Sequence, residues 1–500
     1  MSDSYNAETI LSRFLDDKDL HLPSSLTEKD MLELVDKYIE IDSERVSLNI
    51  LREIIHFPPG KGLNITDKIK LHAKRKEKEE SEKIFSQSSG MQSSISIRYE
   101  KGLDEPLKFD DTGNVGAVSI VVDRDWIEDN KGYPTLWNNF IYLFGIFDNR
   151  LRFTSVSKEN EIGALESLII PSGDHLYRRS FAFDFKEMLV TSQIYSYLQV
   201  LNVLDVRIED MIEWFFNDYL SVEFSIENFI IKMPSDLSSY FEKCRTILPE
   251  IDRIFKQYNM LIEDGEIDQE LIQMSSSSVK VKEVQSFISS KYAYPISECY
   301  KTATYLLFSD QSSLFYLPDK DEKHKNFLDL IMRDNVSKSD FQEHQIQRMN
   351  WLFDNGIVLE NEKGFIKVAD FETIIILKEL YYEDVLNYFH CQPSLKGVID
   401  SLVEKEILVF ENTLLTRNEQ DYFDFYLNKS KFTNDYDIRN RYLHGTNVND
   451  EKQYESDYYS ILKLIIILVI KINDDLYLAD KYNEDGSIEN VDKVWLNKLV

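Results

Sequence analysis

The chain has 500 residues, which is more than one hydrophobic core usually holds, so we expect several domains. Its 43% apolar residues can bury ample surface, whereas its net charge of -31 disfavours general binding to the phosphate backbone of nucleic acids. Only 16 Gly and 11 Pro accompany 30 Phe and 28 Tyr, which favours long helices over many short strands. The composition therefore predicts a mainly α protein, α+β overall, with any RNA site confined to a local basic surface.

Cysteine usage and the first residues indicate a cytoplasmic protein. The cysteines, Cys244, Cys299 and Cys391, are odd in number and far apart, which predicts neither a disulfide framework nor a zinc site. The segment "MSDSYNAETILSRFLDD" is acidic where an export signal would be basic and then apolar. The longest apolar run, "ILKLIIILVIKI" at 461–472, contains Lys463 and is too short to span a bilayer. We expect no contact with membranes.

Residues 1–90 predict an N-terminal helical region. In "SLTEKDMLELVDKYIEI", Thr27 and Asp30 form a capping pair before apolar residues at helical spacing. The one dense basic stretch, "KIKLHAKRKEKEESEK" (68–83), has lysines followed closely by glutamates. This pattern predicts a solvated helix with ion pairs four residues apart rather than an RNA groove. The Ser/Gln/Gly segment at 86–94 then predicts a linker.

The next two regions differ in their periodicity. Residues 95–190 predict an α+β module with strands at "SISIRYE", "AVSIVVDRDW", "LRFTSVS" and "RSFAFDF", although "TLWNNFIYLFGIF" equally suits a buried helix. Residues 191–318 return to helical periodicity and predict a helical region, interrupted by "MSSSSVK" near 274. Strands are therefore expected mainly in the first of these two regions.

Residues 319–372 predict a winged-helix-like segment, because helix, helix and hairpin follow one another and the hairpin turns at "NEKG". Some fifty residues later, "LKGVIDSLVEKEILVFENTLLTRN" repeats the outline, with Ile357 and Ile407 in corresponding places. The second helix of the segment carries Arg348 as its only Arg or Lys. A DNA-reading helix would be basic, so we interpret the wing as structural or as a protein-binding element.

Two other patterns that resemble catalytic motifs are set aside. "FPPGKGLN" (57–64) has neither the spacing nor the preceding strand of a phosphate loop, and we interpret it as a turn that ends a helix. "PDKDEK" (318–323) crowds its carboxylates and lysine into one loop, whereas metal-dependent nucleases place them on separate strands. No cofactor or metal site is predicted.

The stretch "IRNRYLHGT" (438–446) is the most informative in the chain. Arg439 lies five positions before His444, with Asn440 directly after the arginine and Gly445 directly after the histidine. A bare arginine followed by a histidine at this distance arises easily by chance, but the added asparagine and glycine make the pattern specific.

These residues resemble the HEPN superfamily, whose members carry R-x(4-6)-H, often in the form RNxxxHG, within a small helical bundle. The resemblance covers only the C-terminal quarter, roughly 375–500, and it implies a HEPN-like helical domain over 373–500. It further implies a metal-independent endoribonuclease that is commonly a homodimer with two motifs facing one cleft. In bacteria it implies a toxin or anti-phage effector. Some relatives are inactive binding modules.

The chemistry of these side chains agrees with that implication. Metal-independent cleavage of RNA needs proton transfer at the 2′-OH and at the leaving oxygen, which a histidine can perform, and a cation for the phosphate, which arginine suits. The candidate catalytic residues are therefore Arg439, Asn440 and His444, with Asn440 and His444 on one face of a helix. Arg441 and Tyr442 are candidates for contact with RNA.

Two alternatives stay open. In one, Arg439 pairs with a local carboxylate such as Asp435 and His444 closes the helix beside Gly445, so that the stretch is architecture. In the other, the protein is a non-catalytic scaffold that binds protein partners. If it is a nuclease, we expect its upstream domains to sense a trigger, which can be a protein regulator, and to restrain the cleft. The apolar helix expected at 454–472 supports a bundle and self-association.

Overall fold

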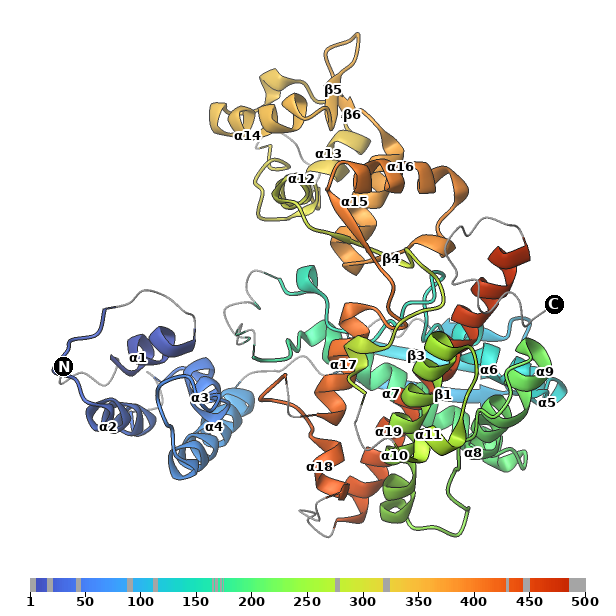
Figure 1. Cartoon of the computed structure of the whole chain (residues 1–500). Helices are drawn as coiled ribbons and strands as arrows, with labels where there is room; N and C mark the ends of the chain where they lie inside the picture. Colours follow the sequence, from blue (N-terminus) through green and yellow to red (C-terminus); the bar gives the residue numbers. More distant parts are fainter. Residues whose placement is uncertain are drawn as a thin grey trace.

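The computed structural model describes residues 6–15, 21–41, 46–87, 93–110, 116–163, 166, 170, 173, 175–274, 279–317, 324–428, 431–443 and 450–484. Helices predominate over strands, which confirms the mainly α prediction (Figure 1). In the described part of the chain, three large hydrophobic cores mark three regions. We call them the N-terminal region (6–87), the central body (94–288 with 412–484) and the repeat region (292–411).

The N-terminal region contains four described helices: α1 (Asn6–Leu15), α2 (Glu28–Ile39), α3 (Leu48–Ile55) and α4 (Asp67–Gln87). The predicted capping pair is confirmed, since the Thr27 hydroxyl accepts the Asp30 N–H and the Asp30 carboxylate accepts the Thr27 N–H. Helix α4 carries the predicted ion pairs, with 3.0 Å from Lys76 Nζ to Glu80. "FPPGKGLN" lies between α3 and α4, where Gly60 has a left-handed φ of 84°, so it is the expected turn.

The central body begins with a small sheet in the order β1-β3-β2, in which β1 is parallel and β2 antiparallel to β3. Its strands are β1 (Ser94–Glu100), β2 (Leu107–Asp110) and β3 (Ala117–Asp123). The strand predicted at "SISIRYE" is confirmed, and "AVSIVVDRDW" is a strand only as far as Asp123, because the Asp123 carboxylate caps a helix that begins at Arg124 by accepting the Asp125 N–H. "LRFTSVS" contributes a single bridge between Phe147 and Phe153 rather than a strand. The strand predicted at "RSFAFDF" is wrong: α7 begins at Phe181 there, because the Ser180 hydroxyl caps it by accepting the Phe183 N–H.

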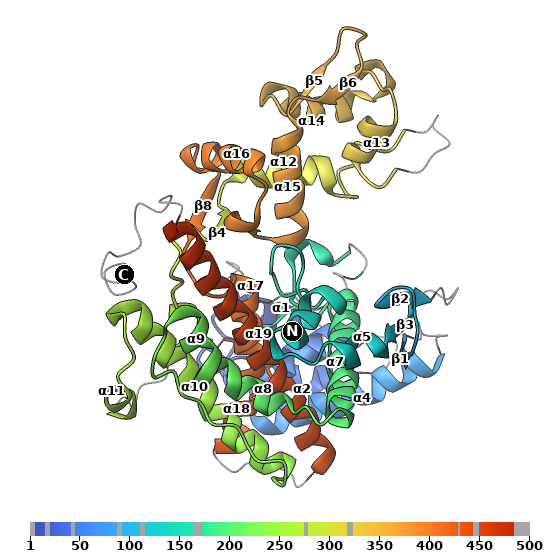
Figure 2. The same ribbon diagram turned by 90° about the vertical axis from the view of Figure 1, so that its right-hand side faces the viewer.

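The remaining described α-helices of the central body pack around one hydrophobic core. The last of them, α19 (Glu451–Glu484), is long and buried on all sides along most of its length. They are α5 (Arg124–Asp129), α6 (Tyr133–Asn138) with the π-helix η1 (Asn139–Leu143), α7 (Phe181–Val203), α8 (Ile208–Trp214), α9 (Leu220–Phe224), α10 (Tyr240–Asp264), α11 (Gln269–Met274), α17 (Arg417–Leu427), α18 (Ile438–Leu443) and α19 (Glu451–Glu484). "TLWNNFIYL" is therefore helical. Figures 1 and 2 show α19 running through this body, where it packs on α10 and α7. Among the described helices, none combines the length and apolar character needed to cross a bilayer.

The cores group the chain differently from the predicted domains. One core joins residues 120–284 to residues 414–476, so the last quarter completes a body that begins near residue 94. The predicted boundary at 190/191 falls inside α7, and the boundary at 372/373 falls inside a helix of the repeat region. The chain leaves the central body, forms the repeat region and then returns to the central body. Helical or strand periodicity along the sequence does not indicate such a return.

The repeat region stands on one side of the central body in both views (Figures 1 and 2). Its described elements are β4 (Tyr292–Pro295), α12 (Glu298–Phe308), α13 (Phe327–Arg333), α14 (Glu343–Asp354), β5 (Val358–Glu360), β6 (Ile366–Val368), α15 (Phe371–Glu383), β7 (Leu386–Asn387), α16 (Pro393–Glu404) and β8 (Leu408–Glu411). The predicted hairpin is confirmed, because β5 and β6 pair antiparallel across a turn in which the Gly364 N–H donates to Asn361 O at 2.8 Å.

The predicted repeat is visible in how α14 and α16 end. After α14, Gly356 has a φ of 66° and the Ile357 N–H donates to Leu352 O at 2.9 Å. Fifty residues later, Glu406 has a φ of 56° and the Ile407 N–H donates to Leu402 O at the same distance. The second copy contributes β7 and β8 to a three-stranded sheet with the order β7-β4-β8. The middle strand, β4, precedes both copies in the sequence.

Buried polar contacts fix the repeat region to the central body. Arg152, 8% exposed, donates from Nη1 to Glu379 Oε1 at 2.9 Å and to Val385 O at 2.6 Å. His390 Nε2 lies 2.8 Å from Asp474 Oδ1 of α19. The junction between the two regions is thus ordered by specific partners, and it encloses the largest cavity described below.

Candidate functional site

The predicted motif begins in the short helix α18, which packs against α10 and α17. Ile438 is 1% exposed and Tyr442 is 2% exposed, and both belong to the hydrophobic core of the central body. These two side chains anchor α18 and leave Arg439 and Asn440 partly exposed. His444 and Gly445 lie outside the described residues.

Arg439 is held by two partners from elsewhere in the chain. Its Nη2 lies 2.5 Å from Asp252 Oδ1 on α10, 187 positions earlier, and its Nη1 donates to Asn428 Oδ1 at 3.0 Å. Both side chains of the ion pair keep contact with solvent, at 18% for Arg439 and 25% for Asp252. Burial raises the pKa of Asp252, while the guanidinium opposes that rise. The pair is therefore only partly protected from water.

Asn440 has a local partner, since its Nδ2 donates to Asp437 Oδ1 at 2.7 Å. Asp437 directly precedes α18 and has a left-handed φ of 47°. Asn440 is thus set at the start of the helix, one turn before the position of His444 in the sequence.

Arg441 and Tyr442 converge on one carboxylate of α19. Arg441 Nη1 donates to Asp457 Oδ2 at 2.9 Å, and the Tyr442 hydroxyl donates to the same oxygen at 2.8 Å. The Asp457 side chain is 4% exposed, and burial raises its pKa. A buried tyrosine and an arginine tied to a buried carboxylate hold α18 against α19, so the geometry gives no support to the predicted RNA contacts of Arg441 and Tyr442.

A shallow depression beside the Arg439 ion pair gathers positive charge. It has a volume of about 510 Å³ and is lined by Asp252 together with Lys232, Arg253 and Lys256. We call it the basic hollow. In a chain with a net charge of -31, three cations around Asp252, the partner of Arg439, form the kind of local basic surface that the composition requires of any RNA site.

Metal ligation finds no support in the described part of the chain, where no group of three or more His, Cys, Asp or Glu side chains is placed to hold a metal ion. The carboxylate-rich segment "PDKDEK" (318–323) lies outside the described residues.

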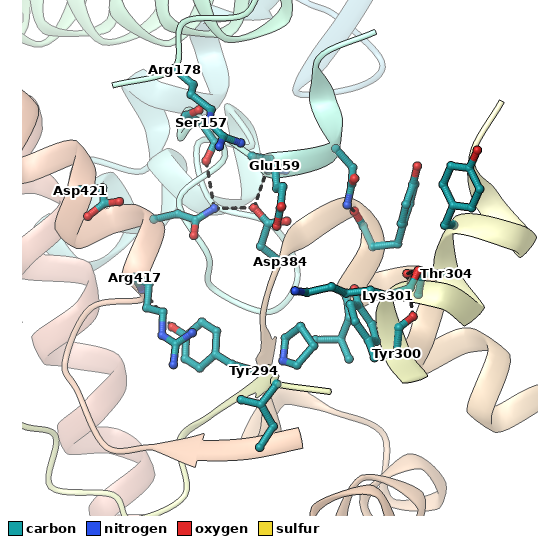
Figure 3. Close-up of a pocket in the computed structure, with 18 of the residues that line it drawn as sticks. Ser157, Glu159, Arg178, Tyr294, Tyr300, Lys301, Thr304, Asp384, Arg417 and Asp421 are labelled. Carbon is teal, nitrogen blue, oxygen red and sulfur yellow. Dashed lines mark hydrogen bonds between the residues drawn. The ribbon is translucent and has the colours of Figure 1, made fainter. Parts of the chain in front are cut away.

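A second candidate site, missed by sequence reasoning, is a cavity of about 870 Å³ between the central body and the repeat region (Figure 3). Asp384 lies at its centre, where its Oδ2 accepts the Glu159 N–H at 3.0 Å and the Asn418 Nδ2 at 2.8 Å. Arg417 and Tyr294 lie on one side of Asp384, and Lys301 lies on the other with Tyr300 and Thr304. Each contributing segment is unremarkable alone, and nothing in the sequence links them.

Searches against protein-family models, curated proteins and solved structures found no match to this chain.

Proposed function

We propose that the protein is a metal-independent endoribonuclease of HEPN type. The observation that carries the proposal is the position of the motif: α18 turns Tyr442 into the core and leaves Arg439 and Asn440 partly exposed, with Arg439 paired to Asp252 of the basic hollow. The resemblance supplies the reaction class. The hollow supplies the local positive surface that an acidic protein needs to hold RNA.

Each motif residue has a role that its chemistry suits. His444 transfers a proton at the 2′-OH or at the leaving 5′-oxygen, because imidazole titrates near neutral pH. Arg439 neutralises the charge that develops on the phosphate through its guanidinium, whose Nη atoms now bind Asp252 and Asn428. The phosphate would then share or replace the carboxylate of Asp252. Asn440 orients the imidazole or a phosphate oxygen.

We further propose that the active form is a homodimer. One chain supplies one motif histidine, whereas cleavage needs both a general base and a general acid. A two-fold axis would bring two copies of the same groups to one cleft. In this arrangement the N-terminal and repeat regions control how the motifs meet, as expected of a toxin or anti-phage effector. Light scattering tests this directly: a chain that cleaves RNA while remaining monomeric at micromolar concentration contradicts the shared cleft.

The test of the proposed function is cleavage of bulk RNA by the full chain in excess EDTA, with the product ends identified. We expect cleavage to persist and to leave 2′,3′-cyclic phosphate and 5′-OH ends, because the 2′-OH is the nucleophile. A metal-bound water would usually leave a 5′-phosphate instead. His444→Ala should abolish cleavage, whereas His344→Ala, which removes an exposed histidine of α14, should not. A His444→Ala protein that cuts RNA at the wild-type rate ends the assignment.

A second candidate function is that of a protein-binding scaffold, and one contact favours it for the repeat region. Arg348, the single Arg or Lys of α14, donates to Ser312 O at 3.1 Å within its own region. Helix α14 therefore presents a single cation that is already hydrogen-bonded within its own region, whereas a helix that reads nucleic acid is basic, and this suits contact with a protein. A chain that binds a partner but releases no cyclic-phosphate ends, alone or with that partner, would have the scaffold function.

A further inference from the structure

The cavity between the central body and the repeat region has the size and the walls of a small-molecule site. Its volume of about 870 Å³ falls within the range of pockets that bury compact ligands. The central body contributes the segment 157–160 and the first turn of α17, and the repeat region contributes β4, α12 and α15. Arg439 of the motif does not line it.

Positive charge outweighs negative charge in the described lining of this cavity, the reverse of the chain as a whole. The cations are Lys158, Arg178, Lys301, Arg417 and Lys431, and the carboxylates are Glu159, Asp384 and Asp421. Most of these cations pair with carboxylates, some of which lie outside the lining, so the attraction for a ligand comes from the cations that have no buried counter-ion. The expected ligand is an anion.

Two of the cations are available to such an anion. The other three are committed to carboxylates that are at most 35% exposed: Lys158 to Glu383, Arg417 to Glu411 and Lys431 to Asp421. Arg178 has no ion-pair or hydrogen-bond partner within the described residues. Lys301 pairs with Glu298 at 2.8 Å, but both side chains are exposed, at 68% and 84%, and such pairs are weak.

Helix α12 adds aromatic surface next to Lys301. Tyr305 is 43% exposed and lies one helical turn after Lys301, whereas Tyr300 is buried. Lys301 and Tyr305 also line an adjoining depression of about 500 Å³ that contains Trp351. Aromatic rings beside cations suit a ligand that joins a planar base to phosphates, because the base stacks on the ring while the cations neutralise the phosphates.

We propose that this cavity binds a nucleoside triphosphate, with the phosphates on Arg178 and Lys301 and the base packed against Tyr305. The volume suits one nucleotide rather than a strand. The three cations paired with carboxylates, Lys158, Arg417 and Lys431, and the hydrogen-bonded Asp384 fix the positions of the segments that form the cavity wall. This site is separate from the RNA-cleaving motif and does not depend on the function proposed for it.

Titration calorimetry of the full chain with ATP, GTP and UTP tests the proposal, with adenosine and tripolyphosphate as fragments. We expect at least one triphosphate to bind more tightly than either fragment. Arg178→Ala and Lys301→Ala should each weaken binding about tenfold or more, as expected for a lost charge-assisted hydrogen bond. Two matched controls should leave the affinity unchanged: Arg179→Ala, whose arginine pairs with Asp184, and Lys280→Ala, whose lysine pairs with Glu283 three positions away.

The proposal is overturned if none of the three nucleotides binds below about 1 mM, or if Arg178→Ala and Lys301→Ala bind like wild type. Binding that is lost in Arg439→Ala but kept in Arg178→Ala would place the nucleotide at the motif and also overturn it. If Arg178→Ala fails to fold, the exposed Lys301→Glu variant carries the same test. The His444→Ala protein should bind nucleotide normally, so failure of the nuclease proposal and failure of this one are distinguishable.

Discussion

Helices α18 and α19 are neighbours in the sequence, yet they use charged side chains in opposite ways. In α18, Arg439 and its partner Asp252 are 18% and 25% exposed. In α19, Lys471 is 0% exposed and lies 2.7 Å from Glu419, which is 1% exposed. A partly exposed pair can exchange one partner for a ligand at lower cost than a fully buried pair can. Arg439 of α18 can therefore exchange its partner for a ligand, whereas Lys471 of α19 is held in the core by its partner.

The buried lysines of α19 are satisfied by partners that other helices deliver. Lys463 is bound to Glu187 of α7, which also accepts hydrogen bonds from the hydroxyls of Ser155 at 2.8 Å and Tyr422 at 2.9 Å. Burial lowers the pKa of Lys463, and Glu187 opposes that change. A lysine in an apolar run is therefore tolerated because α7 and α17 complete its environment.

The largest expected effect comes from removing one partner of this buried pair. Lys463→Ala should lower the free energy of unfolding by about 3 to 5 kcal/mol, because Glu187 stays buried without its counter-ion. Guanidinium denaturation measures the loss, and Lys481→Ala at the exposed end of α19 is the control. Replacing both partners, by Lys463→Met with Glu187→Leu, should recover part of the stability. A loss of unfolding free energy below about 1 kcal/mol for Lys463→Ala would contradict the claim that the buried charged pairs of α19 are structural.

The second effect is on activity. Arg439→Ala should reduce RNA cleavage about 100- to 1,000-fold, the range found when a group that stabilises developing charge is removed. Its cost in stability should be small, since the ion pair with Asp252 is partly solvated. Asn440→Ala should fall between Arg439→Ala and wild type. Cleavage rates and melting temperatures must come from the same preparations, and a variant that loses stability but keeps its rate shows that Arg439 is structural.

Arg441→Ala sharpens the comparison within α18 itself. We expect a loss of about 1 to 3 kcal/mol in unfolding free energy, because Asp457 is buried and loses a charged donor, with little change in cleavage. Arg333→Ala, which removes an exposed arginine paired with Asp329, is the matched control. If instead Arg441→Ala weakens RNA binding and leaves stability intact, the RNA contact predicted from the sequence is restored.

The smallest effect is a pH dependence where the N-terminal region meets the segment before α18. His56 Nδ1 lies 3.0 Å from Thr433 O, and burial lowers the pKa of His56 below its ordinary 6.5. The unfolded chain therefore takes up a proton more readily, so this contribution to stability is present above pH 6.5 and is lost as the pH falls through the lowered value. His56→Asn keeps a donor without titrating. Its melting temperature should decline less on acidification than that of wild type, and equal declines would contradict the assignment.

Local rules in the sequence determined a good part of this protein. The capping box at Thr27, strands β1 and β3, the hairpin at Asn361–Gly364 and the fifty-residue repeat all follow from patterns within a few residues. The motif at Arg439–Gly445 also lies within a few adjacent residues of the sequence. "RSFAFDF" misled because Phe181 and Phe183 alternate as in a strand, while the cap at Ser180 starts a helix.

Only the tertiary structure decided which segments that are distant in the sequence come into contact. It brought Asp252 to Arg439 across 187 positions, and it placed β4 between strands that follow it by about a hundred residues. It also built a cationic cavity from segments of two regions and buried Lys463 with a partner on α7. The physical reason is the same in each case: ion pairing, sheet order and cavity walls depend on which segments meet in space, and helical or strand periodicity does not encode those meetings.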